Sequence, residues 1–116
     1  EGFYYLLDRK KDMIISGGVN IYPKDIEEVV HTHPDVMEVA VIGIPSEKWG
    51  EQVKAFVVLK DGRNATKEEI LSFSNKKLAK YQHIKEIEFL SSLPRNASGK
   101  ILKRELRKQH IQINQK

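Results

Sequence analysis

MEVAVIGI, residues 37–44, and EQVKAFVVLK, residues 51–60, are two runs of mainly apolar, β-branched residues. Such runs are typical of strands buried inside a sheet, because β-branched side chains pack well on a pleated surface. PSEKWGE, residues 45–51, separates them with turn-forming and charged residues and predicts a loop. We therefore expect two central strands, and the remaining elements are placed around them.

A helix is predicted before the first central strand. Pro23 suits the first turn of a helix, where its missing N–H costs no hydrogen bond. Ile26, Val29 and Val30 follow at helical spacing and form one apolar stripe. The helix is expected to end near HTHPD, residues 31–35, because the proline there cannot continue it.

A second helix and a third strand are predicted after the second central strand. TKEE, residues 66–69, has the form of a capping box, in which a threonine and a glutamate three residues later satisfy the first backbone N–H groups. Ile70, Phe73 and Leu78 are expected on the buried side of this helix. KEIEFL, residues 85–90, alternates like a strand that turns Ile87 and Phe89 inward.

The two ends of the chain add a hairpin and a basic helix. Residues 3–7 and 13–15 predict short strands on either side of a charged turn, and Gly17-Gly18 with the return through residues 19–21 predicts a small hairpin. Lys103 to about His110 predicts a short basic helix. The fold class expected from these elements is α+β: a small mixed sheet with flanking helices and an N-terminal hairpin.

Composition limits the function classes. The 116 residues are about one domain by the usual length prior, and 40% hydrophobic with 31% charged residues is typical of soluble globular domains. No apolar run approaches the ~20 residues needed to cross a bilayer. The chain has no cysteine, which excludes disulfides and thiolate chemistry, and no leader opens it, so we expect a cytoplasmic protein. Because it opens directly on a strand-like segment, EGFYYLL, we expect a piece of a longer protein.

Three local patterns favour structural interpretations. ASGK, residues 97–100, ends like a phosphate-binding loop, but the first glycine of that pattern is missing and Ile101 follows the lysine in place of Ser or Thr. His31 and His33 are two apart at a helix end, so their side chains should diverge and bind no metal. The basic residues from Lys100 to Lys108 read as a solvated helix face with inward leucines.

The residues alone leave two function classes open: a small binding module or part of an enzyme. The element order β-α-β-β-α-β is similar to that of ferredoxin-like domains, which often bind RNA. No aromatic-rich ribonucleoprotein signature lies on a predicted core strand, which speaks against that class. Trp49, in a charged loop, offers either a half-buried anchor or a flat face for stacking.

Two longer motifs carry a family resemblance. DRKKDMIISGGVNIYPKDIE, residues 8–27, and LPRNASGKILKREL, residues 93–106, resemble the C-terminal domain of adenylate-forming (AMP-binding) enzymes, and the acyl-CoA synthetases most closely. The resemblance covers nearly the whole chain.

The resemblance implies an ATP-dependent acid–thiol ligase. A carboxylic acid, fatty or aryl, reacts with ATP to give an acyl-adenylate, and a thiol, usually of coenzyme A, then displaces AMP. ATP, Mg²⁺ and the acid are held mainly by an N-terminal domain outside this chain, so the fragment alone is expected to be inactive. The implied division is residues 1–22 as hinge and hairpin and residues 23–116 as a compact core with a catalytic-lysine loop. The implied partners are the N-terminal domain and the substrates, with no nucleic acid.

The resemblance also implies residue roles. Lys100 reaches the substrate carboxylate and the α-phosphate during adenylation, where a compact ammonium can bridge two anions. Lys11 is the hinge about which the domain turns between the half-reactions, and Arg9 lies near the nucleotide. Gly18 lines the tunnel through which the thiol arm passes, where a missing side chain leaves room.

Four further positions correspond to the coenzyme A site of relatives: Trp49, Tyr81, His83 and Lys85. Many relatives carry Lys or Arg at or near Gln82 and His83 and a proline at Ile84. Fewer positive groups there weaken the expected contact with the 3′-phosphate, so a carrier-protein thiol stays open as the alternative acceptor.

Overall fold

The computed structural model describes residues 13–114, with side-chain surroundings described as far as residue 110. The described elements are β1 (Ile14–Ser16), β2 (Val19–Ile21), α2 (Pro23–His31), β3 (Val36–Ser46), β4 (Gly50–Leu59), α3 (Lys67–Asn75), the 3₁₀ turn η1 (Lys80–Gln82), β5 (Ile84–Phe89) and α4 (Lys103–Asn114). The expected α+β class is confirmed. The strand predicted at residues 3–7 lies outside the described residues.

The main sheet has three strands in the order β3-β4-β5, and β1 and β2 form a separate two-stranded sheet. β3 and β4 are antiparallel, whereas β4 and β5 are parallel and pair directly, from Val53 opposite Ile84 onward. A ferredoxin-like sheet would place a further strand between these two parallel neighbours. Here β2 pairs with β1 instead. The similarity in element order therefore does not extend to the strand order of the described sheet.

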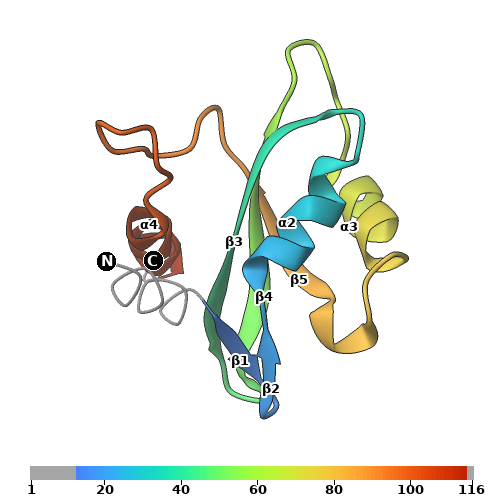
Figure 1. The fold of residues 1–116 in the computed structure, drawn as a ribbon, viewed down its shortest axis with the longest axis vertical. Helices are drawn as coiled ribbons and strands as arrows, with labels where there is room; N and C mark the ends of the chain where they lie inside the picture. Colours follow the sequence, from blue (N-terminus) through green and yellow to red (C-terminus); the bar gives the residue numbers. More distant parts are fainter. Residues whose placement is uncertain (1–12, 115–116) are drawn as a thin grey trace.

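Helices cover both faces of the main sheet, as Figure 1 shows, with α2 and α3 on one side and α4 on the other. Alternate strand residues face opposite sides, so β3 and β4 each supply side chains to two cores. The α2–α3 core includes Ile26, Val30, Val41, Val53, Ile70 and Ile87. The α4 core contains Ala40, Ile42, Ile44, Phe56, Val58, Leu93 and Leu106. This burial on both faces explains why the runs in β3 and β4 are continuous in the sequence instead of alternating.

The predicted helix starts are confirmed, but two of the residues expected on the buried side of α3, Leu78 and Phe73, lie differently. Pro23 occupies the first turn of α2, and the reciprocal capping box of Thr66 and Glu69 is present at the start of α3. α3 ends at Asn75, so Leu78 is buried from the segment after the helix. Phe73 is only half-buried and meets the His33 ring edge-on at 4.8 Å between ring centroids, instead of joining the core.

The β3–β4 connection is shorter than the loop predicted for residues 45–51. Pro45 pairs with Glu51 and Ser46 with Gly50, so both strands extend into that segment. β3 is an edge strand, where a proline without an N–H can be tolerated. β1 begins and ends one residue later than predicted, and α4 continues past His110 to Asn114. Within residues 13–114, no helix is long and apolar enough to span a bilayer.

Candidate functional site

Residues 94–102, which we call the lysine loop, form a small hydrogen-bonded structure that carries Lys100. Arg95 and Ile101 form an antiparallel bridge, and Leu102 N donates to Pro94 O at 2.8 Å. Within this frame the Asn96 side-chain oxygen accepts the backbone N–H of Ser98 at 2.9 Å and of Lys100 at 3.0 Å. The side chain of Asn96 thus replaces a backbone partner across the turn, which is a common use of asparagine in tight loops.

Backbone geometry explains the glycine before the lysine. Gly99 has a φ of +84° and donates its N–H to Asn96 O at 2.9 Å, closing the turn. Residues with a Cβ rarely adopt this conformation, so Gly99 lets the chain reverse directly before Lys100. Lys100 itself is exposed. Leu93 anchors the chain that enters the loop, being only 5% exposed in the α4 core.

Gly18 and Trp49 lie at the other end of the molecule. Gly17 and Gly18 both have positive φ, +58° and +81°, as expected for the two central residues of a tight β-hairpin. Gly17 N donates to Trp49 O at 2.8 Å, which joins this hairpin to the β3–β4 connection. Trp49 is 43% exposed, and the Lys48 ammonium lies 4.9 Å from its ring centroid. We call Gly17, Gly18 and Trp49 the hairpin corner.

The remaining coenzyme A candidates lie at this same sheet end. Tyr81, 52% exposed, belongs to η1, and η1 contacts β2 of the hairpin. His83 is half-buried directly before β5, and Lys85 is exposed at the start of that strand. The structure therefore brings Trp49, Tyr81 and His83 to one end of the sheet. Arg9 and Lys11 lie outside the described residues.

The lysine loop and the hairpin corner are at opposite ends of the main sheet. The loop follows the end of β5 and is tied to Glu38 near the start of β3, whereas Trp49 follows the end of β3 at Ser46. From Glu38 to Ser46 the strand extends for about 26 Å. Figure 1 shows the dark-orange lysine loop at the upper left of the view and the β1–β2 hairpin at the bottom.

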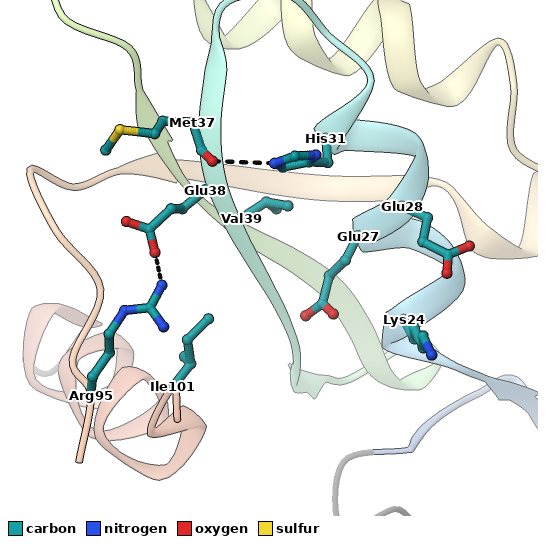
Figure 2. A pocket seen from close by; sticks show the side chains of 9 residues that line it. All are labelled: Lys24, Glu27, Glu28, His31, Met37, Glu38, Val39, Arg95 and Ile101. Atoms are coloured by element: carbon teal, nitrogen blue, oxygen red, sulfur yellow. Dashed lines mark hydrogen bonds and ion pairs between the residues drawn. The ribbon is translucent and has the colours of Figure 1, made fainter. Parts of the chain in front are cut away.

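A groove of about 400 Å³ lies between α2, the start of β3 and the lysine loop. Figure 2 shows Arg95 pointing toward Glu38 on one side of the groove, with Glu27 and Glu28 on the α2 side. His31 also lines this groove, and its Nε2 lies 3.3 Å from Met37 O, while His33 Nδ1 accepts the N–H of Asp35 at 3.1 Å. Both histidines thus have local structural contacts, and residues 13–114 hold no cluster of three or more candidate metal ligands.

One polar cluster was not predicted from the sequence. Lys54, in the middle of β4, is fully buried, and its Nζ lies 2.8 Å from Glu88 Oε1, 3.1 Å from Glu86 Oε2 and 2.8 Å from His110 Nδ1. Lysine has only donors, so His110 Nδ1 accepts and the ring is neutral in this arrangement. Burial lowers the pKa of His110 below its usual 6.5 and the Lys54 cation lowers it further, while Glu86 and Glu88 partly oppose the change. The cluster fastens α4, and so the end of the lysine loop, to the sheet.

Comparison with known proteins identifies the family. The profile of the AMP-binding enzyme C-terminal domain matches residues 25–100, a span that runs from α2 to Lys100. The chain belongs to this family. The family resemblance expected from the two motifs is confirmed.

Acid–CoA ligases are among the relatives of this AMP-binding C-terminal domain. A 2-succinylbenzoate–CoA ligase of Bacillus cereus (strain Q1) is 58% identical over 107 residues, covering 92% of this chain and 22% of the relative. ATP-bound MatB from Rhodopseudomonas palustris superposes with a TM-score of 0.84 at 40% identity, covering 87% of this chain and 20% of that one. A double mutant of o-succinylbenzoate CoA synthetase from Bacillus subtilis, bound to a product analogue, gives a TM-score of 0.77 at 41% identity over 84% of this chain and 20% of that one. The chain thus spans about a fifth of the length of the relatives it matches.

Proposed function

We propose that this chain is the mobile C-terminal domain of an AMP-forming acid–CoA ligase and that Lys100 acts in its first half-reaction. The observation that carries the proposal is the lysine loop, in which five backbone and side-chain hydrogen bonds within residues 95–100 hold the turn that ends at Lys100. An exposed lysine on a braced turn is suited to entering a cleft formed by another domain. The missing N-terminal part would supply that cleft, together with the sites for ATP, Mg²⁺ and the acid.

In adenylation, the carboxylate oxygen attacks the α-phosphorus of ATP and pyrophosphate leaves. Two anions must approach each other, and negative charge gathers on the phosphate oxygens as the new bond forms. The Lys100 ammonium lowers this barrier by lying between the carboxylate and the α-phosphate, because a preorganised cation needs no reorientation at the moment of reaction. A relative of known structure, MatB, binds ATP, which supports ATP as the nucleotide.

In the second half-reaction, the thiol attacks the acyl-adenylate carbonyl and AMP leaves. We assign the hairpin corner to this step, with Gly18 lining the path of the thiol arm and Trp49, Tyr81, His83 and Lys85 near the nucleotide end of coenzyme A. Gly18 is open toward solvent, since a Cβ placed there would meet nothing within 4 Å. The thiol arm of coenzyme A would therefore have space to pass at this position.

The separation of the two sites supports a domain that turns between the steps. One active-site cleft cannot receive the lysine loop and the hairpin corner together when about 26 Å of strand lies between them. Rotation about Lys11, the hinge assigned by the first motif, would replace the lysine loop by the hairpin corner in the active-site cleft. Arg9, beside this hinge, would contact the nucleotide.

Coenzyme A is proposed as the acceptor, and an aromatic acid of the 2-succinylbenzoate type as the acid. The relatives that are 57–58% identical are 2-succinylbenzoate–CoA ligases, although they are compared only over a fifth of their length. A carrier-protein thiol is the second candidate acceptor. Gln82 and His83 favour it, because neither is the Lys or Arg that many relatives carry at or near the proposed 3′-phosphate contact.

The deciding experiment compares both half-reactions in the full-length protein that contains this chain. Lys100→Ala should lower acid-dependent pyrophosphate exchange by about 10²–10³-fold, the usual effect of losing one preorganised electrostatic contact. Thioester formation from supplied acyl-adenylate and coenzyme A should stay within a few-fold of wild type. Lys108→Ala is the matched control, because it removes an exposed lysine from the helix that follows the same loop.

Three outcomes separate the alternatives. Normal rates in both half-reactions would mean that Lys100 is a surface lysine, and equal losses in both, with a lower melting temperature, would assign it to folding. Only a loss confined to the first half-reaction supports the catalytic role. Lys100→Arg should restore little, since a planar guanidinium replaces a compact ammonium poorly in a narrow cleft.

A further inference from the structure

The lysine loop is fastened to the body of the domain by an ion pair at each end. At its entry, the Arg95 guanidinium pairs with Glu38 of β3. Directly after it, Lys103 Nζ lies 2.9 Å from Glu27 Oε2 of α2, and the same oxygen accepts Val41 N at 2.8 Å. Both carboxylates line the groove in Figure 2, Glu38 from β3 and Glu27 from α2.

Arg95 reaches two partners at once. Its Nη1 donates to Gly99 O at 2.7 Å, the carbonyl directly before Lys100, while its Nη2 donates to Glu38 Oε1. A guanidinium has donors fixed in one plane, so making both bonds fixes the distance and direction between β3 and the Gly99 peptide. The Arg95 side chain thus connects the sheet to the backbone of residue 99.

We propose that Arg95, held by Glu38, is a positioning residue that sets where Lys100 is presented during adenylation. The proposal rests on the catalytic role assigned to Lys100 above. Arg95 acts through the Gly99–Lys100 peptide and needs no contact with substrate. A misplacement of a catalytic group by about 1 Å can cost roughly 10²-fold in rate. A loop that keeps its fold but loses the two contacts of Arg95 should therefore still support adenylation poorly.

Stability alone does not account for this arrangement. The Arg95 side chain is 41% exposed and that of Glu38 is 26% exposed, and ion pairs in such surroundings contribute little to global stability. Asp35 and Arg63 form a comparable pair at 3.6 Å at the same end of the sheet, with Arg63 56% exposed. That pair joins the residue before β3 to the turn after β4 and lies outside the lysine loop, so Arg63→Gln is a matched control.

The experiment uses the full-length protein and five variants: Arg95→Gln, Arg95→Lys, Arg63→Gln, Lys100→Ala and the double variant Arg95→Gln/Lys100→Ala. Pyrophosphate exchange, with 2-succinylbenzoate as the first acid, reports adenylation, and thioester formation from supplied acyl-adenylate reports the second step. Hydrogen–deuterium exchange of the peptide covering residues 94–102 reports the loop independently of activity.

Arg95→Gln should lower the kcat of pyrophosphate exchange by about 10–100-fold, leave KM for ATP and acid nearly unchanged, and spare the second step. Its loop peptide should exchange faster, whereas Arg63→Gln should match wild type in every assay. Because Arg95 acts through Lys100, the double variant should be no slower in adenylation than Lys100→Ala alone. Arg95→Lys should recover only part of the rate, since one ammonium replaces a two-armed contact.

The outcomes distinguish failure of this proposal from failure of the function assigned to Lys100. A slow Lys100→Ala beside a normal Arg95→Gln, or losses that multiply in the double variant, would overturn the positioning role while the catalytic lysine stands. A normal Lys100→Ala would overturn the catalytic assignment and with it the kinetic role of Arg95, and the deuterium exchange would then report only whether Arg95 fastens the loop.

Discussion

Lys54 Nζ and His110 Nδ1 lie 2.8 Å apart, although the two residues are 56 positions apart in the chain. The contact joins the centre of the sheet to α4, and α4 directly follows the lysine loop. It is made between a buried ammonium and a neutral imidazole that accepts its hydrogen bond, and the carboxylates of Glu86 and Glu88 also face the pair.

This contact predicts a pH-dependent stability. The pKa of His110 is lowered in the folded chain, chiefly by burial, so the unfolded chain binds a proton first as pH falls. Stability contributed by neutral His110 is therefore fully present above about pH 6.5 and is lost as the pH falls toward the folded-state pKa. The loss cannot exceed about 1.4 kcal/mol per pH unit for a single proton.

The measurement is the free energy of unfolding of the 116-residue chain and of His110→Gln, by urea denaturation at several pH values. Glutamine can accept from Lys54 but does not titrate, so the difference between the two proteins isolates His110. Wild type should lose stability relative to the variant below about pH 6.5. A difference that stays constant with pH would show that His110 does not titrate differently on unfolding.

Lys54→Met should destabilise the chain. Breaking a buried ion pair from one side typically costs about 3–5 kcal/mol, and we expect about 3 because the Glu86 side chain is 42% exposed and stays hydrated. The change also removes a cation that lies 4.7 Å from the Phe56 ring centroid. Lys60→Met changes the exposed lysine directly after β4; it is the control and should stay within about 0.5 kcal/mol. Equal or greater stability in Lys54→Met would mean that packing compensates for the lost pair.

The strands and caps were predictable because their signals are local. The β-branched runs became β3 and β4, and the Thr66–Glu69 box begins α3 where a four-residue pattern placed it. The shorter β3–β4 connection was not predictable, since residues 45 and 46 are strand only because residues 51 and 50 lie opposite them. Register across a pair is a tertiary property, and local composition does not contain it.

The Lys54 cluster was missed for a related reason. A lysine in a strand is ordinarily exposed, so residue type argued against burial. Because side chains alternate between the two faces of a strand, Lys54 lies on the same face of β4 as Phe56. Glu86 and Glu88 lie on the face of β5 that points away from Ile87. The pairing of Lys54 with Glu86 and Phe56 with Glu88 makes these charges meet, and that register appears only in the structure. The roles of Lys100 and Gly18 came from the family motifs and stay predictions.

Gly18 offers a test of the thiol path with an internal control. Gly18 and Gly62 both have positive φ, +81° and +77°, and a Cβ built on either meets nothing within 4 Å. Alanine at either position should therefore cost the same backbone strain, about 1 kcal/mol, with no clash inside the domain. The two glycines differ in place, because Gly18 is in the hairpin corner and Gly62 is in the turn after β4.

If the thiol arm passes Gly18, a side chain there obstructs a molecule that comes from outside the domain. Gly18→Leu in the full-length protein should then lower thioester formation from supplied acyl-adenylate by at least about 10-fold, a loss of roughly 1.4 kcal/mol in transition-state stabilisation. Pyrophosphate exchange, which uses the opposite end of the sheet, should remain near wild type. Gly62→Leu carries the same strain and should spare both steps. Equal behaviour of the two variants would attribute Gly18 to hairpin geometry alone, whereas a loss in the thioester step confined to Gly18→Leu places the thiol path at this hairpin.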